Sequence, residues 1–207
     1  MQITKISPAV KTAGRYNIYV DHKYSFSLDE LQLVQCGIAK GQEIDADKLE
    51  ALKSDSAYGK NYIRAIDLIS RRYRSEHEIR DYARRKSWTA DNTERVIKRL
   101  YQHGYLDDAR FAQLYSSSRY QSGRYSLKRI RLDLTKKGIR SDLINQVLAQ
   151  YDDTTALNQL IAKKRAKYND DQKLTAYLIR NGFRYDDVRR ALDQLDTNWP
   201  DSEKGYL

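Results

Sequence analysis

Two adjacent carboxylates stand near the middle of the chain, in the stretch GYLDDARFA at residues 104–112. Such a pair could bind a divalent metal or act as a general acid and base if suitable partners stood beside it. The three histidines, His22, His77 and His103, share no ligand spacing with Asp107 and Asp108 or with one another. We therefore expect neither a metal site nor catalysis here.

A structural role explains the same stretch. Gly104 is expected to take the left-handed conformation that ends a helix, with the next two residues folding back on it. Asp107 is expected to cap the following helix and Asp108 to favour its first turn, while Phe111 and Leu114 continue one apolar face. The junction motif consists of Gly104, Tyr105, Leu106, Asp107, Asp108 and Phe111.

Other catalytic patterns are also missing from the sequence. It contains no Gly-x-Ser-x-Gly elbow, no glycine-rich phosphate loop before a lysine, and no Cys-x-x-Cys or His-x-Glu pair. The single cysteine, Cys36, lies in an apolar context typical of a packed thiol. We expect a protein that is not an enzyme, with no catalytic residue, no metal and no cofactor.

Composition limits the class of protein. Of the 207 residues, 40% are hydrophobic and 32% are charged. The apolar runs are far shorter than the roughly 20 residues that a membrane helix needs, and the opening residues show no secretory signal pattern. We expect a cytoplasmic protein without membrane contact.

Charge is distributed unevenly along the chain. Residues 57–140 carry 21 basic and 9 acidic side chains, a net of +12, whereas residues 1–50 and 141–207 each carry a net of −1. The remaining segment, residues 51–56, is neutral, so the whole formal excess of +10 lies in the middle. Such a block is typical of a protein whose partner is rich in phosphates or carboxylates.

The first segment, residues 1–56, predicts β structure. Residues 15–20 and 23–26 are rich in aromatic and β-branched side chains around the short turn Asp21-His22, which indicates a hairpin. Residues 3–6 could add a third, edge strand. Residues 27–30 are expected to open a short helix, with Ser27 as its N-cap.

From about Ala57 onward the pattern is helical, and it repeats. An offset of 51 residues lays 79–100 over 130–151, and an offset of 44 lays the second copy over a third. The first offset aligns Ile79 with Ile130 and Val96 with Val147. The second aligns Ile130 with Leu174. Three copies of one helical unit are therefore present.

Each copy is expected to contain three helices. The third helix follows a Gly-aromatic or Gly-Ile turn and is entered through an aspartate that could cap it: Asp91, Asp142 or Asp186. The expected boundaries are 57–105, 106–151 and 152–196, with a C-terminal tail at 197–207. Because a unit of this size cannot bury its apolar face alone, we expect an all-α, elongated and curved tandem array of three three-helix repeats.

Two groups of basic residues flank the second helix of the first two copies. The first basic cluster contains Arg71, Arg72, Arg74, Arg80, Arg84, Arg85 and Lys86. The second basic cluster contains Arg124, Lys128, Arg129, Arg131, Lys136, Lys137 and Arg140. All of them except Arg80 are candidate contacts to an acidic partner. Lysine and arginine on a helix are commonly only a solvated face, so the prediction depends on the clusters as a whole.

Three stretches together resemble the RecX family, regulators of the bacterial RecA recombinase. They are SRRYRSEHEIR at residues 70–80, the junction motif, and KKGI at residues 136–139 together with Gly123, Ile130 and Leu134. The resemblance covers residues 57–151 in motifs and 152–196 in architecture. Ala83 and Ser87-Trp88 depart from the family's usual leucine and Gly-Phe, which affects local packing.

The resemblance implies an all-helical, non-catalytic protein that binds RecA and its filament on single-stranded DNA. Family members mostly inhibit the recombinase, lowering its ATPase, strand-exchange and co-protease activities, and so act on DNA repair, recombination and the SOS response. They do so by docking in the filament groove or capping the growing end. We expect a monomer that contacts several protomers of the filament through both basic clusters, with at most weak direct DNA binding.

Two other functions remain open at this point. Residues 124–148 could also form two helices and a turn of the helix-turn-helix kind, so that the chain binds DNA directly, without the recombinase. An enzyme acting on nucleic acid is the third and least supported interpretation. Salt-sensitive binding to naked DNA would favour the first of these.

Overall fold

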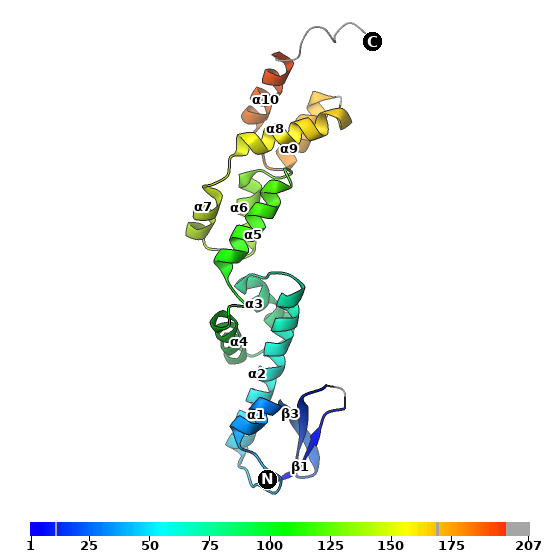
Figure 1. Ribbon diagram of the computed structural model, residues 1–207, viewed down its shortest axis with the longest axis vertical. Coiled ribbons are helices and arrows are strands. Elements are labelled where there is room, and N and C mark those ends of the chain that lie inside the picture. Colours follow the sequence, from blue (N-terminus) through cyan, green and yellow to red (C-terminus); the bar gives the residue numbers. More distant parts are fainter. Residues whose placement is uncertain (11, 169, 198–207) are drawn as a thin grey trace. The chain divides into compact units, whose positions relative to one another are not determined.

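The computed structural model describes residues 1–10, 12–168 and 170–197. The chain is mostly helical, with a small N-terminal sheet, and it forms two compact units that divide between Asp107 and Asp108 (Figure 1). This confirms the mostly helical architecture with repeated three-helix groups, while the curvature of the array stays a prediction. No helix in the described ranges is long and apolar enough to cross a membrane.

The N-terminal sheet has three antiparallel strands in the order β1-β2-β3, with bounds Ile3–Pro8, Arg15–Val20 and Lys23–Asp29. Asp21 and His22 both have positive φ, 47° and 66°, as a two-residue hairpin turn between right-twisted strands requires. The hairpin and the edge strand are therefore confirmed. Ile3, Ile18 and Leu28 are fully buried in the core beneath the sheet.

Helix α1 (Glu30–Cys36) begins two residues later than the sequence suggested. Ser27 stays in β3, paired with Asn17, so it cannot be the N-cap. Asp29 is the N-cap instead: its carboxylate accepts from the Gln32 amide at 2.8 Å, and the Gln32 side chain accepts from the Asp29 amide at 3.1 Å. This reciprocal capping box was available in the sequence, because Gln32 follows Asp29 by three residues.

Helix α2 (Ala46–Arg71) is the longest element, and it begins well before Ala57. Its first half packs on the sheet, where Leu52 joins the N-terminal core and the Ser56 hydroxyl donates to the Ser27 carbonyl at 2.6 Å. Its second half is the first helix of the first repeat (Figure 1). The boundary expected between residues 56 and 57 thus falls inside one helix, because the two halves of α2 pack into different hydrophobic cores.

The first repeat is completed by α3 (Glu76–Arg85) and α4 (Ala90–Gln102). Its core contains Ala65 of α2, Ile79 of α3 and Val96, Ile97 and Leu100 of α4. Leu106, which the sequence assigned to the second repeat, is also buried in this core.

The second unit contains two further three-helix groups. The first is α5 (Asp108–Gln121), α6 (Leu127–Lys136) and α7 (Ser141–Leu148). The second is α8 (Asp153–Lys164), a short 3-10 turn η1 (Arg165–Lys167), α9 (Asp171–Arg180) and α10 (Tyr185–Thr197). Each group has its own core, and Tyr120 packs against both cores. The tail beyond Thr197 lies outside the described residues.

Two expectations are wrong: the capping role of three aspartates, and the burial of Leu114. Asp91, Asp142 and Asp186 are not N-caps, because they lie inside the first turns of α4, α7 and α10. Their negative charges interact favourably with the helix dipole there. Thr89 caps α4, and Arg140 stands at the N-cap of α7 without a side-chain hydrogen bond. Leu114 is 41% exposed and is not on the buried face of α5, which contains Phe111, Ala112 and Ser116.

Candidate interaction surface

The junction motif ends α4 as predicted. Gly104 has a φ of 69°, and the amides of Tyr105 and Leu106 both donate to the Leu100 carbonyl, at 2.8 and 3.2 Å. Asp108 lies in the first turn of α5, and Phe111 is buried in the core of the second repeat. The capping role of Asp107 stays a prediction. Within the described ranges, no group of three or more histidine, cysteine, aspartate or glutamate side chains could hold a metal ion.

Several residues of the first basic cluster form hydrogen bonds and ion pairs within the repeat. Arg72 makes two hydrogen bonds to the Glu78 carboxylate, at 2.9 and 3.0 Å, which raise the pKa of Arg72. Arg80 bridges α3 and α4 by pairing with Glu76 at 2.7 Å and with Glu94. Arg74 is partly buried, and burial lowers its pKa. These guanidiniums hold the repeat together.

The other part of the cluster is accessible, at the C-terminal end of α3. Arg84 pairs with Asp81 at 3.0 Å, and its side chain is 76% exposed. Arg85 is exposed and has no acidic partner in the part of the chain that the structure describes. Lys86 is exposed and lies 6.0 Å from the centre of the Tyr82 ring. Arg71, the last residue of α2, is exposed beside Asp67.

The second basic cluster divides in the same way. Arg129 pairs with Asp133 at 3.4 Å, Arg140 pairs with Asp142 at 3.2 Å, and Arg131 donates to the Asn145 side chain. Lys137 lies 5.8 Å from the centre of the Phe111 ring. Among the described residues, no acid is paired with the exposed residues Arg124, Lys128 and Lys136, nor with Arg131, which the Asn145 amide holds. Lys128 and Lys136 are therefore the accessible cations of α6 that have neither an acid nor an amide partner among the described residues, and Arg124 lies just before this helix.

Equivalent contacts recur in the two repeats. Arg80 reaches Glu94, and 51 residues further on Arg131 reaches Asn145. In both repeats the second helix is thus tied to the third at the same position. The repeat found by hydrophobic alignment is also present in the polar contacts.

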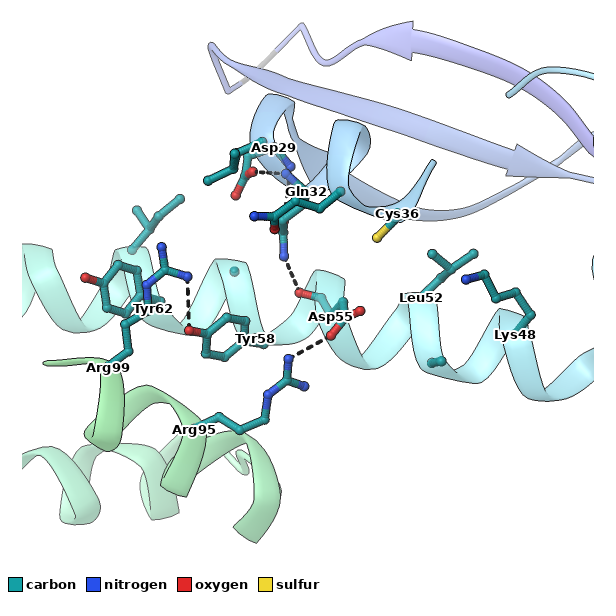
Figure 2. A pocket seen from close by; sticks show the side chains of 15 residues that line it. Asp29, Gln32, Cys36, Lys48, Leu52, Asp55, Tyr58, Tyr62, Arg95 and Arg99 are labelled. Carbon is teal, nitrogen blue, oxygen red and sulfur yellow. Dashed lines mark hydrogen bonds and ion pairs between the residues drawn. The ribbon is translucent and has the colours of Figure 1, made fainter. Parts of the chain in front are cut away.

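Sequence reasoning missed a group of arginines that lie on tyrosine rings. Arg99 lies 4.8 Å from the centre of the Tyr62 ring and donates to the Tyr58 hydroxyl at 3.2 Å, while Arg95 lies 4.4 Å from the centre of the Tyr58 ring (Figure 2). The signal was present as two tyrosines four residues apart and two arginines four residues apart. Only the packing of α4 on α2 brings the two pairs together.

These side chains line a pocket of about 520 Å³ between α1, α2 and α4. Figure 2 shows Gln32 reaching from α1 to the backbone carbonyl of Asp55, at 2.5 Å, and Arg95 reaching the Asp55 carboxylate from the other side. A β-carbon on Gly59 would stand 2.5 Å from the end of the Gln32 side chain, so a larger residue here would displace the Gln32 amide from its present position. Cys36 also lines this pocket, and burial raises the pKa of its thiol.

Models of three domains of one family match the sequence. The regulatory protein RecX N-terminal domain matches residues 1–45, the first three-helix domain of RecX matches 62–100, and the second matches 107–148. The regulatory protein RecX of Listeria monocytogenes serotype 4b (strain CLIP80459) is 33% identical over 192 residues, which are 88% of this chain and 71% of that protein. The chain belongs to the RecX family.

Further relatives agree with the assignment. The regulatory protein RecX of Bacillus pumilus (strain SAFR-032) is 31% identical over 201 residues, which are 93% of this chain and 76% of that protein. A crystal structure of regulatory protein RecX superposes with a TM-score of 0.72 at 28% identity, covering 93% of this chain and 98% of that one. The RecX structure from Lactobacillus salivarius, at 24% identity and a TM-score of 0.58, covers 68% of this chain and 97% of that one and supports the fold.

Proposed function

We propose that this RecX-family chain is a mostly inhibitory regulator of the RecA recombinase, which binds the enzyme and its filament on single-stranded DNA. It lowers the ATPase, strand-exchange and co-protease activities, and so acts on DNA repair, recombination and the SOS response. It works in the cytoplasm as a non-enzyme, without a cofactor. The two basic clusters contact acidic side chains and phosphates across more than one filament protomer.

One observation carries the choice of contact surface. Both repeats present exposed cations without an acidic partner, in the described part of the chain, at the C-terminal end of the second helix: Arg85 in the first repeat and Lys136 in the second. These two residues are equivalent under the 51-residue offset. Repetition of an accessible charge at one repeat position suits a partner that itself repeats, as a filament does.

The test is the ATPase rate of a RecA recombinase on single-stranded DNA, titrated with this protein well below one copy per recombinase. The test variant replaces Arg85, Lys86, Lys128 and Lys136 by glutamine. A matched control removes four exposed charges of the third repeat: Lys163, Lys167, Arg180 and Arg189. Wild type and control should inhibit, and the test variant should need at least tenfold more protein. Equal inhibition by both variants would contradict the proposed surface.

The second candidate function is direct DNA binding through α6 and α7. It is favoured by the exposed lysines of α6, Lys128 and Lys136. Binding to naked DNA should then weaken steeply with salt, and each lost phosphate contact should reduce the logarithmic salt slope by about 0.7–0.9. Loss of recombinase activity that merely follows coverage of the DNA would favour this function over the first.

A further inference from the structure

Arg15, at the start of β2, is a buried cation that forms no ion pair with any described residue. Its side chain is only 6% exposed, and burial lowers the pKa of its guanidinium. It donates to the hydroxyl and the carbonyl of Ser27, while Nη1 has no hydrogen-bond partner in the described part of the protein. Asp29 faces it across the β2–β3 pairing, but this carboxylate caps α1.

A pocket of about 600 Å³ opens at this arginine. Two more cations line it from one face of α2, Lys60 and Arg64, and neither forms an ion pair with any described residue. No acid stands among the described residues that line the pocket, which otherwise provide the Asn17 amide and apolar groups such as Ile63. The pocket therefore gathers three positive charges, and Asp29, which faces Arg15 across the strand pair but does not line the pocket, offsets part of the charge of Arg15.

A second, shallower pocket of about 300 Å³ shares Lys60, Arg64 and Tyr24 with the first. It continues along α2 to Lys53, and the described residues that line it again include no acid. Tyr24 is 54% exposed and borders both hollows. A flat aromatic ring therefore stands beside the group of cations.

The three cations limit which kind of ligand the pocket could bind. A buried guanidinium hydrogen that lacks an acceptor costs free energy that an oxyanion would recover, and hydrogen bonds to charged groups are the stronger kind. One carboxylate would balance only one of the three cations. A phosphate monoester carries a charge of about −1.5 to −2 at neutral pH and three acceptor oxygens, which suits three donors better. Tyr24 adds a stacking surface for a base.

We propose that this groove, the Arg15 pocket, binds the 5′-phosphate monoester of a nucleotide. Arg15, Lys60 and Arg64 hold the phosphate, and the base stacks on Tyr24. The nucleotide is either free or the 5′ end of a strand, because both present the same chemistry. The site lies apart from the two basic clusters and does not rest on the proposed function.

The experiment titrates the full chain with four probes in a calorimeter: deoxyadenosine 5′-monophosphate, a short thymidine oligonucleotide with a 5′-phosphate, the same oligonucleotide with a 5′-hydroxyl, and a glutamate peptide. Lys60→Gln with Arg64→Gln is the test variant, since Arg64 is exposed, Lys60 is only half-buried, and changing them avoids the folding risk of changing Arg15. Lys40→Gln with Lys98→Gln removes the same charge from exposed positions of the same unit that line neither pocket.

Saturable binding of the monophosphate or of the phosphorylated strand, weakened at least tenfold in the test variant and unchanged in the control, is the expected result. Tyr24→Ala should weaken it about threefold or more. The two phosphorylated probes distinguish a free nucleotide from a strand end. The proposal is overturned if the 5′-hydroxyl strand binds as well as the phosphorylated one, if the peptide binds better than either, or if both double variants behave like wild type.

Discussion

Arg95 on α4 donates a hydrogen bond of 2.8 Å to Asp55 on α2, and the two residues are 40 positions apart in the sequence. The same aspartate accepts from Gln32 of α1 through its backbone carbonyl. Asp55 therefore joins the helix that packs on the sheet to the first three-helix repeat. Within this unit, the N-terminal segment and the repeat should unfold together.

Removing this link should loosen the unit. We expect Asp55→Ala to reduce the free energy of unfolding by about 1 kcal/mol, since the pair is only partly shielded from solvent. A double-mutant cycle with Arg95→Ala, measured by urea denaturation, isolates the pairwise energy. The exposed pair of Arg71 with Asp67 is the control and should give nearly zero. Equal coupling energies for the two pairs would contradict the linking role.

The turn between the second and third helices predicts a pair of opposite effects. Ser87 has a φ of 52° where the second repeat has Gly138 at 75°. A side chain in this left-handed region costs about 1–2 kcal/mol. Ser87→Gly should therefore stabilise the protein by about 1 kcal/mol, and Gly138→Ser should destabilise it by a similar amount. The unfolding temperatures of both variants measure these two effects. Shifts of the same sign would show that left-handed strain does not explain the difference between the two turns.

Two neighbouring aspartates should respond to pH in opposite directions. Burial raises the pKa of Asp153, whose Oδ1 accepts from the Leu127 amide at 2.6 Å, while hydrogen bonds from the Thr155 amide lower the pKa of Asp152. The ionised form of Asp153 is thus the less stable one in the fold. Its contribution to stability is complete below the ordinary pKa of about 4 and is lost as pH rises through the raised value.

Asparagine variants test this. Asp153→Asn should be more stable than wild type at pH 7, with the difference disappearing near pH 3. Asp152→Asn should be less stable at pH 7, because its lowered pKa gives stability that is present above the ordinary value and lost in acid. Denaturant unfolding at the two pH values provides the comparison. A stabilising Asp152→Asn would show that the two environments are wrongly assigned.

The second basic cluster should separate into contact and framework residues. Lys128→Gln with Lys136→Gln should weaken recombinase inhibition several-fold and leave the unfolding free energy within about 0.5 kcal/mol, as for ordinary surface changes. Arg131→Ala removes the contact to Asn145 and should lower stability by about 1 kcal/mol. Inhibition curves and unfolding curves on the same preparations measure both. Loss of stability in the lysine variant would remove the distinction.

The helical repeats, the hairpin and the end of α4 could be predicted from the amino-acid sequence, because each depends on local spacing. Ile79, Ile130 and Leu174 follow one apolar pattern and all three are fully buried. Gly104 takes its left-handed conformation because the chain ends α4 there, with the next two amides donating back to the last turn of the helix. The segment that carries the excess positive charge could also be predicted, since the net charge of a segment is a sum over its residues and does not depend on the fold.

Which charges are accessible could be learned from the folded chain alone. Arg80 and Arg85 stand five residues apart in one basic cluster, yet Arg80 is held by acids of two helices and Arg85 is exposed. Likewise, nothing in the residues around Arg15 shows that it is buried. Its partners come from strand pairing and from the packing of α2, which are contacts between distant parts of the chain. Ion pairing and burial depend on such contacts, so sequence spacing alone could not predict them.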